Sequence, residues 1–255
     1  MFVKSRDLGP VRHLTLDRVD RMNAVPVDGW DQLRVAFEEF ERSDLRVLVV
    51  RGAGENFCAG ADLGDGPVPL ESLETASDSM RRTGAAALAL HEITKPTVAA
   101  VSGVAVGAGM NLALGCDIVL ADKSARFSEV FVRRGLTLDF GGTWLLPRIV
   151  GMAKAKDLAL TGRIVDAAIA EQMGLVARVV DDLDTALAEL TEQLALSAPM
   201  GVRAIKAGLH AAGQVGFGEA IDLEGTAQAE CLVSDDFAEG VSAFFDRRSP
   251  DFKGR

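Results

Sequence analysis

The chain has 255 residues, which suits one large domain or a domain with an appendage, and 48% of them are hydrophobic, enough for a sizeable core. Its formal net charge of −10 lacks the basic footprint of a nucleic-acid-binding protein, and it does not attract anionic ligands. Any bound phosphate must therefore be held by local basic groups or by backbone N–H donors.

The three cysteines, Cys58, Cys116 and Cys231, stand far apart and form no CxxC or Cys/His cluster. They predict buried free thiols in a reducing cytosol and give no indication of a metal site. The first ten residues lack the apolar core of a signal peptide, and the apolar stretch 97–114 is too short and too interrupted by glycine to span a membrane. We therefore expect a soluble cytoplasmic protein.

Short strands alternate with helices in the first half of the chain. Residues 10–16 alternate between two faces and predict a strand, while residues 46–50 form the continuous apolar run typical of a strand buried on both faces. Apolar residues spaced by three and four predict an amphipathic helix over 30–40. The glycine-rich loop 52–66 follows, and segment 64–69 is typical of either a lid or a disordered surface loop.

The middle of the chain continues this alternation. The helix predicted before Pro96 has its apolar residues on one face, namely Leu73, Met80, Ala87 and Leu88. Buried strands are predicted over 97–101 and 117–120, and between them a turn over 103–109 opens a helix.

The rest of the chain is predicted to be mostly helical. A strand over 176–180 and a helix over 186–196 precede a helical C-terminal region. Alternating strands and helices predict an α/β architecture, although periodicity does not resolve whether the sheet is open, closed or spiral.

Two glycine-rich turns, at 56–63 and 103–111, each follow a predicted strand. Their small residues let a ligand approach the backbone closely, and the second turn opens a helix, whose first N–H groups lack internal partners and carry positive potential. Two converging N–H donors could stabilise a developing enolate oxygen, and losing one such donor costs roughly 3 kcal/mol. Spacing alone, however, favours tight packing bends.

Five sequence segments carry a resemblance to a known family: NFCAGADL, KPTVAAVSGVAVGAGMNLALGCDIVLAD, ARF, GLTLDFGGTWLLPRIVG and FFDRRSPDFKGR. Together they resemble the enoyl-CoA hydratase/isomerase (crotonase) superfamily, from Arg12 to the C-terminus. The resemblance implies an α/β fold, a crotonase-like spiral of ββα units with an acyl-CoA site over 1–197. It also implies a C-terminal helical oligomerisation region over 198–255, which would assemble the protein as a homotrimer or hexamer.

The resemblance also implies the residues of the site. Ala61 and Ala108 correspond to the two backbone oxyanion donors of the family. The neighbouring residues would line the substrate and coenzyme A: Ala59, Gly60, Asp62, Leu63, Gly107 and Phe131. Lys253 matches a family position where a basic residue approaches the CoA phosphates, sometimes those of a neighbouring subunit, but it is equally typical of an ordinary exposed terminal lysine.

The acid and base groups vary within the superfamily. Its hydratases use two glutamates, at positions that correspond to Asn111 and Phe131 here. Asn cannot act as a general base and Phe has no proton to exchange, so the two-glutamate mechanism does not fit this chain. Asp139, in GLTLDFGG, stands where several isomerases and some dehalogenases of the superfamily carry an acid. The pattern is most similar to the 2-(1,2-epoxy-1,2-dihydrophenyl)acetyl-CoA isomerase-like branch.

The mechanism implied by this resemblance needs one carboxylate. Asp139 removes a proton from carbon, the oxyanion hole holds the dienolate, and the same acid returns a proton elsewhere, with Asn111 orienting the substrate or the carboxylate. An apolar pocket would raise the pKa of Asp139 and make it a better base. An aspartate before two glycines is also common in turns, which is the structural alternative. Glu129 is a reserve second acid, should the local register shift.

Three functions follow from these expectations. The favoured one is an enoyl-CoA isomerase that uses Asp139. The others are an enoyl-CoA hydratase or hydrolase of fatty-acid or aromatic-acid degradation acting through Asp139 or Glu129, and a non-catalytic acyl-CoA-binding homologue. In each the partner is an acyl-CoA thioester, so coenzyme A is part of the substrate, and we expect no separate cofactor, metal, membrane or nucleic acid. The acyl group is not identified, because its pocket depends on region 64–86.

Overall fold

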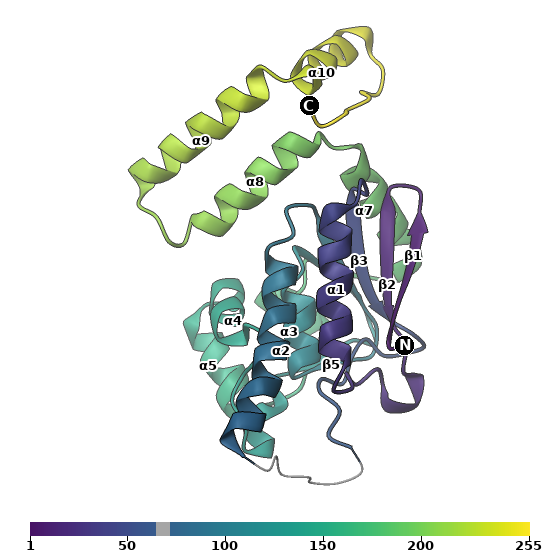
Figure 1. Ribbon diagram of the computed structural model, residues 1–255, viewed down its shortest axis with the longest axis vertical. Coiled ribbons are helices and arrows are strands. Elements are labelled where there is room, and N and C mark those ends of the chain that lie inside the picture. The colour runs from purple at the N-terminus through teal and green to yellow at the C-terminus, as the bar shows by residue number, and fades with distance from the viewer. Residues whose placement is uncertain (65–71) are drawn as a thin grey trace.

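The computed structural model describes residues 1–64 and 72–255 (Figure 1). Of the predicted lid or surface loop, residues 65–69 lie outside the described residues. A six-stranded sheet forms the centre of the molecule, and only its first two strands pair antiparallel. Its strands, in spatial order, are β1 (Val3–Leu8), β2 (Val11–Leu16), β3 (Val47–Gly52), β4 (Thr97–Val101), β6 (Ile118–Asp122) and β9 (Arg178–Val180).

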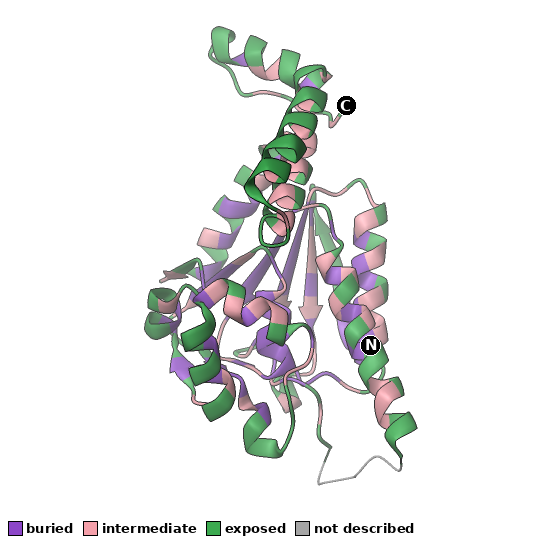
Figure 2. Cartoon of the chain, turned by 90° about the vertical axis from the view of Figure 1, so that its left-hand side faces the viewer, coloured by how far each residue is buried: buried purple, intermediate pink, exposed green. Residues whose placement is uncertain are grey.

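Both faces of this sheet are buried, as the apolar run over 46–50 predicts. In β3, Leu48 and Val50 belong to one core cluster, while Val47 and Val49 belong to a second cluster on the opposite face. The buried strands therefore lie inside the molecule with helices outside them (Figure 2). The parallel strands are thereby held as a rigid support for the loops that leave their carboxyl ends.

Helices cover the two faces. On the face of the larger cluster lie α1 (Gly29–Arg42) and α2 (Leu73–His91), which pack against each other, and α7 (Leu183–Leu196) covers the other face. The predicted helix over 30–40 is confirmed, with Trp30 and Phe37 buried. The apolar face predicted for α2 is wrong for its large residues: Leu73, Met80 and Leu88 are exposed, and of the four residues only Ala87 packs against the core. The residues that the helix buries are Thr83, Ala86 and Leu90.

A second, three-stranded sheet lies beside the carboxyl ends of the central strands. Its order is β5 (Val104–Val106), β7 (Arg126–Ser128) and β8 (Val165–Asp166). Part of the predicted turn over 103–109 is therefore the strand β5, which leads directly into the predicted helix, α3 (Ala108–Leu114). The remaining elements of this region are the 3-10 helices η1 (Val19–Arg21) and η2 (Val130–Arg134), and the helices α4 (Gly142–Val150), α5 (Met152–Thr161) and α6 (Ala167–Met173).

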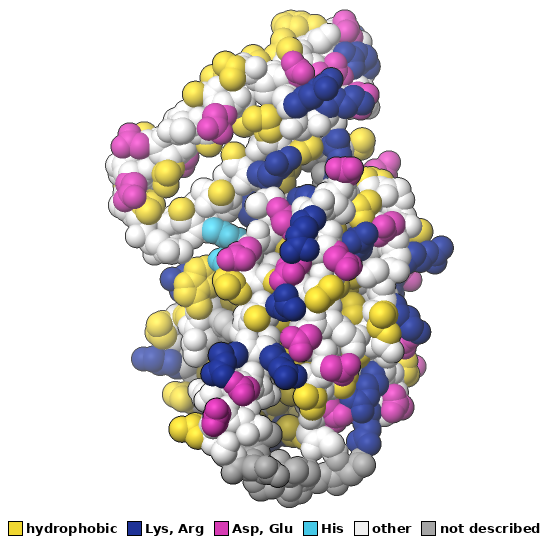
Figure 3. Space-filling model, in the orientation of Figure 1, with side chains coloured by type: hydrophobic (Ala, Val, Ile, Leu, Met, Phe, Trp, Pro, Cys, Tyr) yellow, Lys and Arg dark blue, Asp and Glu magenta, His cyan; other side chains and the backbone are white. Residues whose placement is uncertain are grey.

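Three helices form the C-terminal region: α8 (Pro199–Ala211), α9 (Phe217–Leu232) and α10 (Asp235–Asp246). They project away from the central sheet (Figure 1), and neither α8 nor α9 contains a buried residue. Apolar side chains are spread over this region on the space-filling surface (Figure 3). The most exposed of them are Ile205, Leu209, Phe217, Val233, Phe244 and Phe245.

Candidate active site

The two glycine-rich turns lie side by side. Cys58 pairs with Ala105 of β5 in a parallel bridge, in which the Cys58 N–H donates to Val104 O at 2.8 Å and Val106 N–H donates to Cys58 O at 3.0 Å. Gly109 is required at this contact, because an added Cβ would lie 2.4 Å from the Cys58 carbonyl oxygen. The predicted turns are thus one structure, built from segments some 50 residues apart.

The two proposed oxyanion donors lie where these turns meet. Val25 forms a parallel bridge with Ala61 by bonding the Gly60 carbonyl and the Asp62 N–H, so the Ala61 N–H points away from Val25. Gly60 has φ of +87°, and an added Cβ would lie 3.5 Å from the Ala108 nitrogen. Ala108 is the first residue of α3, whose first N–H groups lack intrahelical partners. Among the described residues, neither the Ala61 N–H nor the Ala108 N–H donates a hydrogen bond to a backbone carbonyl.

This arrangement lies at the carboxyl edge of the parallel strands. The first turn follows β3 and the second follows β4, and these strands run in the same direction. Open α/β sheets generally bind ligands at that edge. Asn23, which no sequence pattern singles out, fastens the first turn: its buried side-chain amide donates to the carbonyls of Ala53 and Asn56.

Asp139 lies in the turn between η2 and α4, and hydrogen bonds fix its backbone. The Asp139 carbonyl accepts from Gly142 N–H at 2.9 Å and from Asn111 Nδ2 at 3.0 Å. The next residue, Phe140, has φ of +48°, a left-handed conformation that costs a bulky residue of order 1–3 kcal/mol. Such strain is common at functional sites and persists only where the surroundings hold it. Here the Phe140 ring packs against Trp30, with centroids 5.6 Å apart.

The glycines after Asp139 make room for Asn111. An added Cβ on Gly142 would lie 2.4 Å from Asn111 Nδ2. The space at Gly142 is therefore taken by the Asn111 amide. That amide is completely buried, and in the described structure its Oδ1 has no hydrogen-bond partner.

The Asp139 carboxyl has the properties of a base. Its Oδ1 is buried and has no partner among the described residues, and burial raises the pKa of Asp139 from 3.8 to about 6. An unsatisfied buried polar atom is costly, so it is expected where a ligand completes the bonding. A carboxyl with a pKa near neutrality is close to the optimum for proton transfer at physiological pH.

A second carboxyl lies beside Asp139. Glu129 is fully buried, and its Oε2 is 3.5 Å from Asn111 Nδ2, while its Oε1 has no partner within the described part of the chain. Burial, together with the charge of Asp139, raises the pKa of Glu129 to about 8, although the bond from Asn111 opposes this shift. The sequence indicates this residue only as a reserve acid. Its position next to a predicted pocket segment is the one signal that points to it.

Phe131 and Gly107 lie next to each other. A Cβ added to Gly107 would lie 3.7 Å from Phe131 Cζ, and the Phe131 side chain is buried. Position 131, where the resemblance implies a glutamate in hydratases, therefore holds an aromatic side chain that packs beside the second glycine-rich turn. The resemblance implies the other glutamate at the position of Asn111, and the residues that Asn111 contacts here are Glu129 and Asp139.

The segment predicted to contact coenzyme A lies on the outer side of the first turn. Asp62 accepts a hydrogen bond from Arg18 at 2.6 Å, and its pKa is lowered by the Gly64 N–H, by Arg18 and by the charge of Arg21. Leu63 is exposed and Ala59 is half-buried. Two arginines thus provide local positive charge next to this turn in an otherwise acidic chain.

Lys253 is far from these turns within the described chain. It lines a cleft with Arg46, Lys95 and Arg203, at the end of the sheet where β3 and β4 begin. A strand the length of β3 spans about 20 Å, and the oxyanion turns follow its other end. Within one subunit Lys253 therefore does not join the other predicted site residues, and its proposed contact with CoA phosphates would require a neighbouring subunit.

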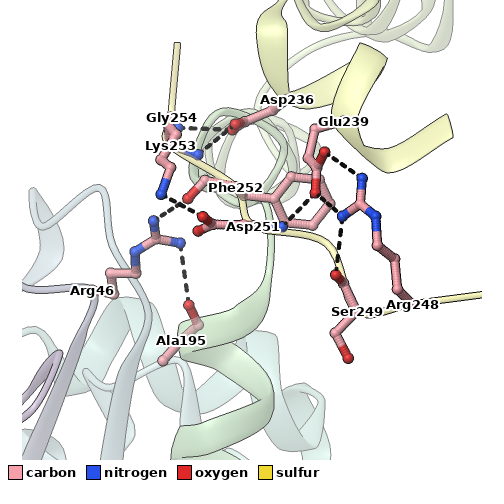
Figure 4. Close-up of polar contacts among 10 residues, drawn as sticks. All are labelled: Arg46, Ala195, Asp236, Glu239, Arg248, Ser249, Asp251, Phe252, Lys253 and Gly254. Atoms are coloured by element: carbon pink, nitrogen blue, oxygen red, sulfur yellow. Dashed lines mark hydrogen bonds and ion pairs between the residues drawn. The ribbon is translucent and has the colours of Figure 1, made fainter. Parts of the chain in front are cut away.

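Polar contacts fix the tail that carries Lys253 (Figure 4). Arg46 donates to the carbonyls of Phe252 and Ala195, and Asp236 accepts the N–H groups of Lys253 and Gly254 at 2.6 and 2.9 Å. The Lys253 ammonium pairs with Asp251. The tail is thereby ordered on the C-terminal region.

The other sequence predictions concern cysteines, metals and membranes. All three cysteines are free, but only Cys58 and Cys116 are buried, since Cys231 lies partly exposed on α9. Within residues 1–64 and 72–255, no group of three or more His, Cys, Asp and Glu residues could hold a metal ion. In the same residues, no helix is both long enough and apolar enough to cross a membrane.

Comparisons with known proteins identify the family of this chain. The family model described as enoyl-CoA hydratase/isomerase matches residues 9–255. The chain is 40% identical to 1,2-epoxyphenylacetyl-CoA isomerase of Escherichia coli, over 100% of this chain and 99% of that protein. It is 32% identical to the short-chain-enoyl-CoA hydratase of Clostridium acetobutylicum, over 97% and 96% of the two chains. The crystal structure of an enoyl-CoA hydratase from Bacillus anthracis matches with a TM-score of 0.94 and 29% identity over the whole of both chains.

Proposed function

Because this chain belongs to the enoyl-CoA hydratase/isomerase family and has its crotonase fold, we propose that it is an enoyl-CoA isomerase whose base is Asp139. The fold predicted from the sequence is confirmed, and an acyl-CoA thioester is the substrate class that the family implies. The choice of isomerisation over hydration is our own proposal.

The proposed reaction moves a double bond, or a ring bond, by proton transfer next to a thioester. The thioester oxygen lies between the N–H groups of Ala61 and Ala108, which stabilise the negative charge that develops when a proton leaves carbon. Asp139 takes that proton, and a proton then returns to another carbon of the dienolate. Because donors of this type are backbone groups, they remain in place when catalytic side chains are changed.

One observation carries the proposal: the partly buried Asp139 has a buried carboxyl oxygen without a partner in the described residues. The resemblance adds that the two positions that hold glutamates in the family's hydratases are Asn111 and Phe131 here. Water therefore lacks the pair of carboxylates that positions and deprotonates it in those enzymes. A 1,3-proton shift needs only a base that can take up a proton and release it, and Asp139 has a pKa of about 6.

A panel of thioesters tests this proposal. The purified protein is incubated with a 3-enoyl-CoA, a 2-enoyl-CoA such as crotonyl-CoA, and a ring-epoxide-CoA, and products are identified by mass spectrometry. We expect conversion of the 3-enoyl or ring-epoxide compound, while crotonyl-CoA stays nearly unchanged. Hydration of crotonyl-CoA at typical enzyme rates, on the order of 10 s⁻¹, would show that the protein is a hydratase.

Hydration is the second candidate function, because Glu129 supplies a second buried carboxyl next to Asp139. Two carboxyls of different pKa could act on a water molecule as base and acid. A third outcome, in which thioesters bind and none is converted, would identify a non-catalytic acyl-CoA-binding protein.

Activity is expected to depend on pH through Asp139. The proton acceptor must be ionised, and the pKa of Asp139 is about 6, so kcat/KM should fall about tenfold per pH unit below that value. Measuring kcat/KM between pH 4.5 and 7.5, with acyl-CoA binding followed at each pH as a control, checks this. A flat profile down to pH 4.5 would exclude a base with a raised pKa.

The proposed assembly is a homotrimer or hexamer. The C-terminal region exposes more apolar side chains than α8, α9 and α10 bury against one another. This exposed apolar surface supports contacts with further copies of the chain. Light scattering at micromolar concentration should give three or six times the mass of one chain. A stable monomer would contradict this assembly, and with it the proposed approach of Lys253 to a neighbouring site.

A further inference from the structure

We propose that Glu129 is a second catalytic residue of this site, which donates the proton that completes the isomerisation begun by Asp139. This inference rests on the proposed function and replaces its single shuttling carboxyl with two carboxyls of different roles. Position 129 is neither of the two positions that hold glutamates in the family's hydratases, so the assignment comes from the geometry of this chain.

The Asn111 amide joins the two carboxyl-bearing residues. Its Nδ2 is 3.0 Å from the Asp139 carbonyl oxygen and 3.5 Å from Glu129 Oε2, so one buried amide contacts both segments. Asn111 itself is in the first turn and a half of α3, the helix that begins with the oxyanion donor Ala108. Glu129 is therefore held at the site through the same helix that forms the oxyanion hole.

Three buried polar atoms of this group have no hydrogen-bond partner among the described residues: Asn111 Oδ1, Glu129 Oε1 and Asp139 Oδ1. Native proteins leave few buried polar atoms unsatisfied, and three in one contacting group indicate a place where a bound molecule completes the bonding. Among the described residues, no Lys or Arg lowers the pKa of either carboxyl. A structural glutamate buried for stability would be expected to have such a partner.

The protonation states of Asp139 and Glu129 favour different roles for the two carboxyls. Burial raises the pKa of both groups, and the negative charge of Asp139 raises that of Glu129 further, to about 8 against about 6 for Asp139. Two negative charges in one buried site repel each other, so near pH 7 the pair carries one proton. That proton resides on Glu129, because Glu129 is fully buried whereas Asp139 is only partly buried. Asp139 is then ready to accept a proton, and Glu129 is ready to donate one.

The proposed step conserves protons and electrons. The Asp139 carboxylate takes a proton from C2 of a 3-enoyl thioester, the C–H electron pair moves into the dienolate, and its oxygen is held by the two backbone donors. Glu129 O–H then gives its proton to C4, the new C–H bond forms, and the dienolate electrons return to give the 2-enoyl thioester. Asp139 is left protonated and Glu129 ionised, and one proton exchanged with solvent at each group restores the starting state.

A deuterium-transfer experiment distinguishes one carboxyl from two. The probe is 3-hexenoyl-CoA deuterated at C2, converted by the full-length protein in ordinary water, with the label at C4 of the product measured by mass spectrometry. A single shuttling carboxyl carries part of the label from C2 to C4. Two separate carboxyls leave the label on Asp139 and deliver a solvent-derived proton from Glu129, so we expect almost no label at C4 with the unmodified protein.

The variant Glu129→Gln keeps the size of the side chain and removes the proton donor. We expect kcat to fall about 100-fold or more, in the range usual for a general acid, with acyl-CoA binding preserved. In the residual turnover Asp139 must return its own proton, so the transfer of label to C4 should rise. Glu129→Asp should restore part of the rate and the low transfer, which a merely structural role of Glu129 would not produce.

Two results would overturn this inference: extensive transfer of label to C4 by the unmodified protein, or unchanged rate and transfer in Glu129→Gln. Extensive transfer of label by the unmodified protein would exclude two separate carboxyls even if Glu129→Gln fails to fold. Two other results would contradict the proposed function itself. They are the absence of 3-hexenoyl-CoA conversion by the unmodified protein, and full activity of Asp139→Asn.

Discussion

Replacing Asp139 by asparagine is expected to lower turnover by about 10²- to 10⁴-fold, the usual contribution of a general base, while acyl-CoA binding changes little. The amide matches the carboxyl in size but cannot accept a proton from carbon. The backbone contacts of Asp139 with Asn111 and Gly142 use its carbonyl oxygen, so they survive the change. Steady-state kinetics with 3-hexenoyl-CoA and calorimetry with a non-reacting acyl-CoA measure the two effects.

The same variant should be more stable at high pH, which separates lost chemistry from lost folding. Folding raises the pKa of Asp139 from 3.8 to about 6, so the ionised carboxyl costs stability as the pH rises through this window. Each unit of difference in pKa between the folded and unfolded states corresponds to about 1.4 kcal/mol. Above pH 6 the rise from 3.8 to about 6 therefore lowers the free energy of unfolding by up to about 3 kcal/mol. Asp139→Asn removes that cost, so its melting temperature at pH 8 should equal or exceed that of the unmodified protein.

The matched control is Asp157→Asn on α5. Asp157 forms an exposed ion pair with Arg163, and such surface pairs contribute at most about 1 kcal/mol. This change should leave kcat unaltered. If Asp139→Asn behaved like the control, Asp139 would be only a turn residue, and Glu129 would be the next candidate base.

Substituting alanine for Gly109 is expected to reduce turnover by about 100-fold or more, although Gly109 bears no reacting group. The new methyl group would lie 2.4 Å from the Cys58 carbonyl oxygen and 2.8 Å from its Cβ, so the two turns must move apart. Ala61 and Ala108 belong to those turns, and a displacement of about 1 Å at a reacting centre can cost 100-fold in rate. Turnover and affinity for a non-reacting acyl-CoA should both be reduced.

Gly84→Ala in α2 is the control for this change. An added Cβ on Gly84 meets nothing within 4 Å, and alanine favours a helix over glycine by about 1 kcal/mol. Its activity should be normal and its stability equal or higher. Normal activity of Gly109→Ala would show that the contact between the turns does not set the geometry of the oxyanion hole.

The sequence predicted the interior strands and the longer helices well, because burial leaves a strong apolar pattern. Residues 47–50 and 98–101 are apolar on both faces, and β3 and β4 lie where the strands predicted over 46–50 and 97–101 place them. The N-terminal strand β1 was missed, since it is an exposed edge strand rich in charged residues. The strands β7 and β8 have three and two residues, too few for any alternation to be recognised.

The prediction of the packing face of α2 was wrong for a related reason. Its large apolar residues, such as Leu73 and Met80, are exposed in a single subunit, and the helix packs closely through Thr83 and Ala86. Hydrophobic periodicity finds large side chains and does not detect a small-residue contact between two helices. The exposed residues remain available for substrate or for another subunit.

The candidate site was predicted in part. The two turns are local motifs, so they could be recognised directly, and the structure brings them together. The grouping of Asn111, Glu129 and Asp139 depends on segments 18 and 28 residues from Asn111 meeting in space, and no spacing rule predicts that contact. The resemblance to a family selected Asp139 and Asn111, whereas the role proposed for Glu129 rests on its burial and its unpartnered oxygen.

The most direct test of Asp139 as the base is proton exchange with solvent. The unmodified protein and Asp139→Asn are incubated with 3-hexenoyl-CoA in deuterium oxide, and the label at C2 and C4 is followed by nuclear magnetic resonance and mass spectrometry. We predict that the unmodified protein forms 2-hexenoyl-CoA carrying solvent deuterium, and that Asp139→Asn gives neither product nor exchange at a comparable rate. Full isomerisation and exchange by Asp139→Asn would contradict the assignment of the base.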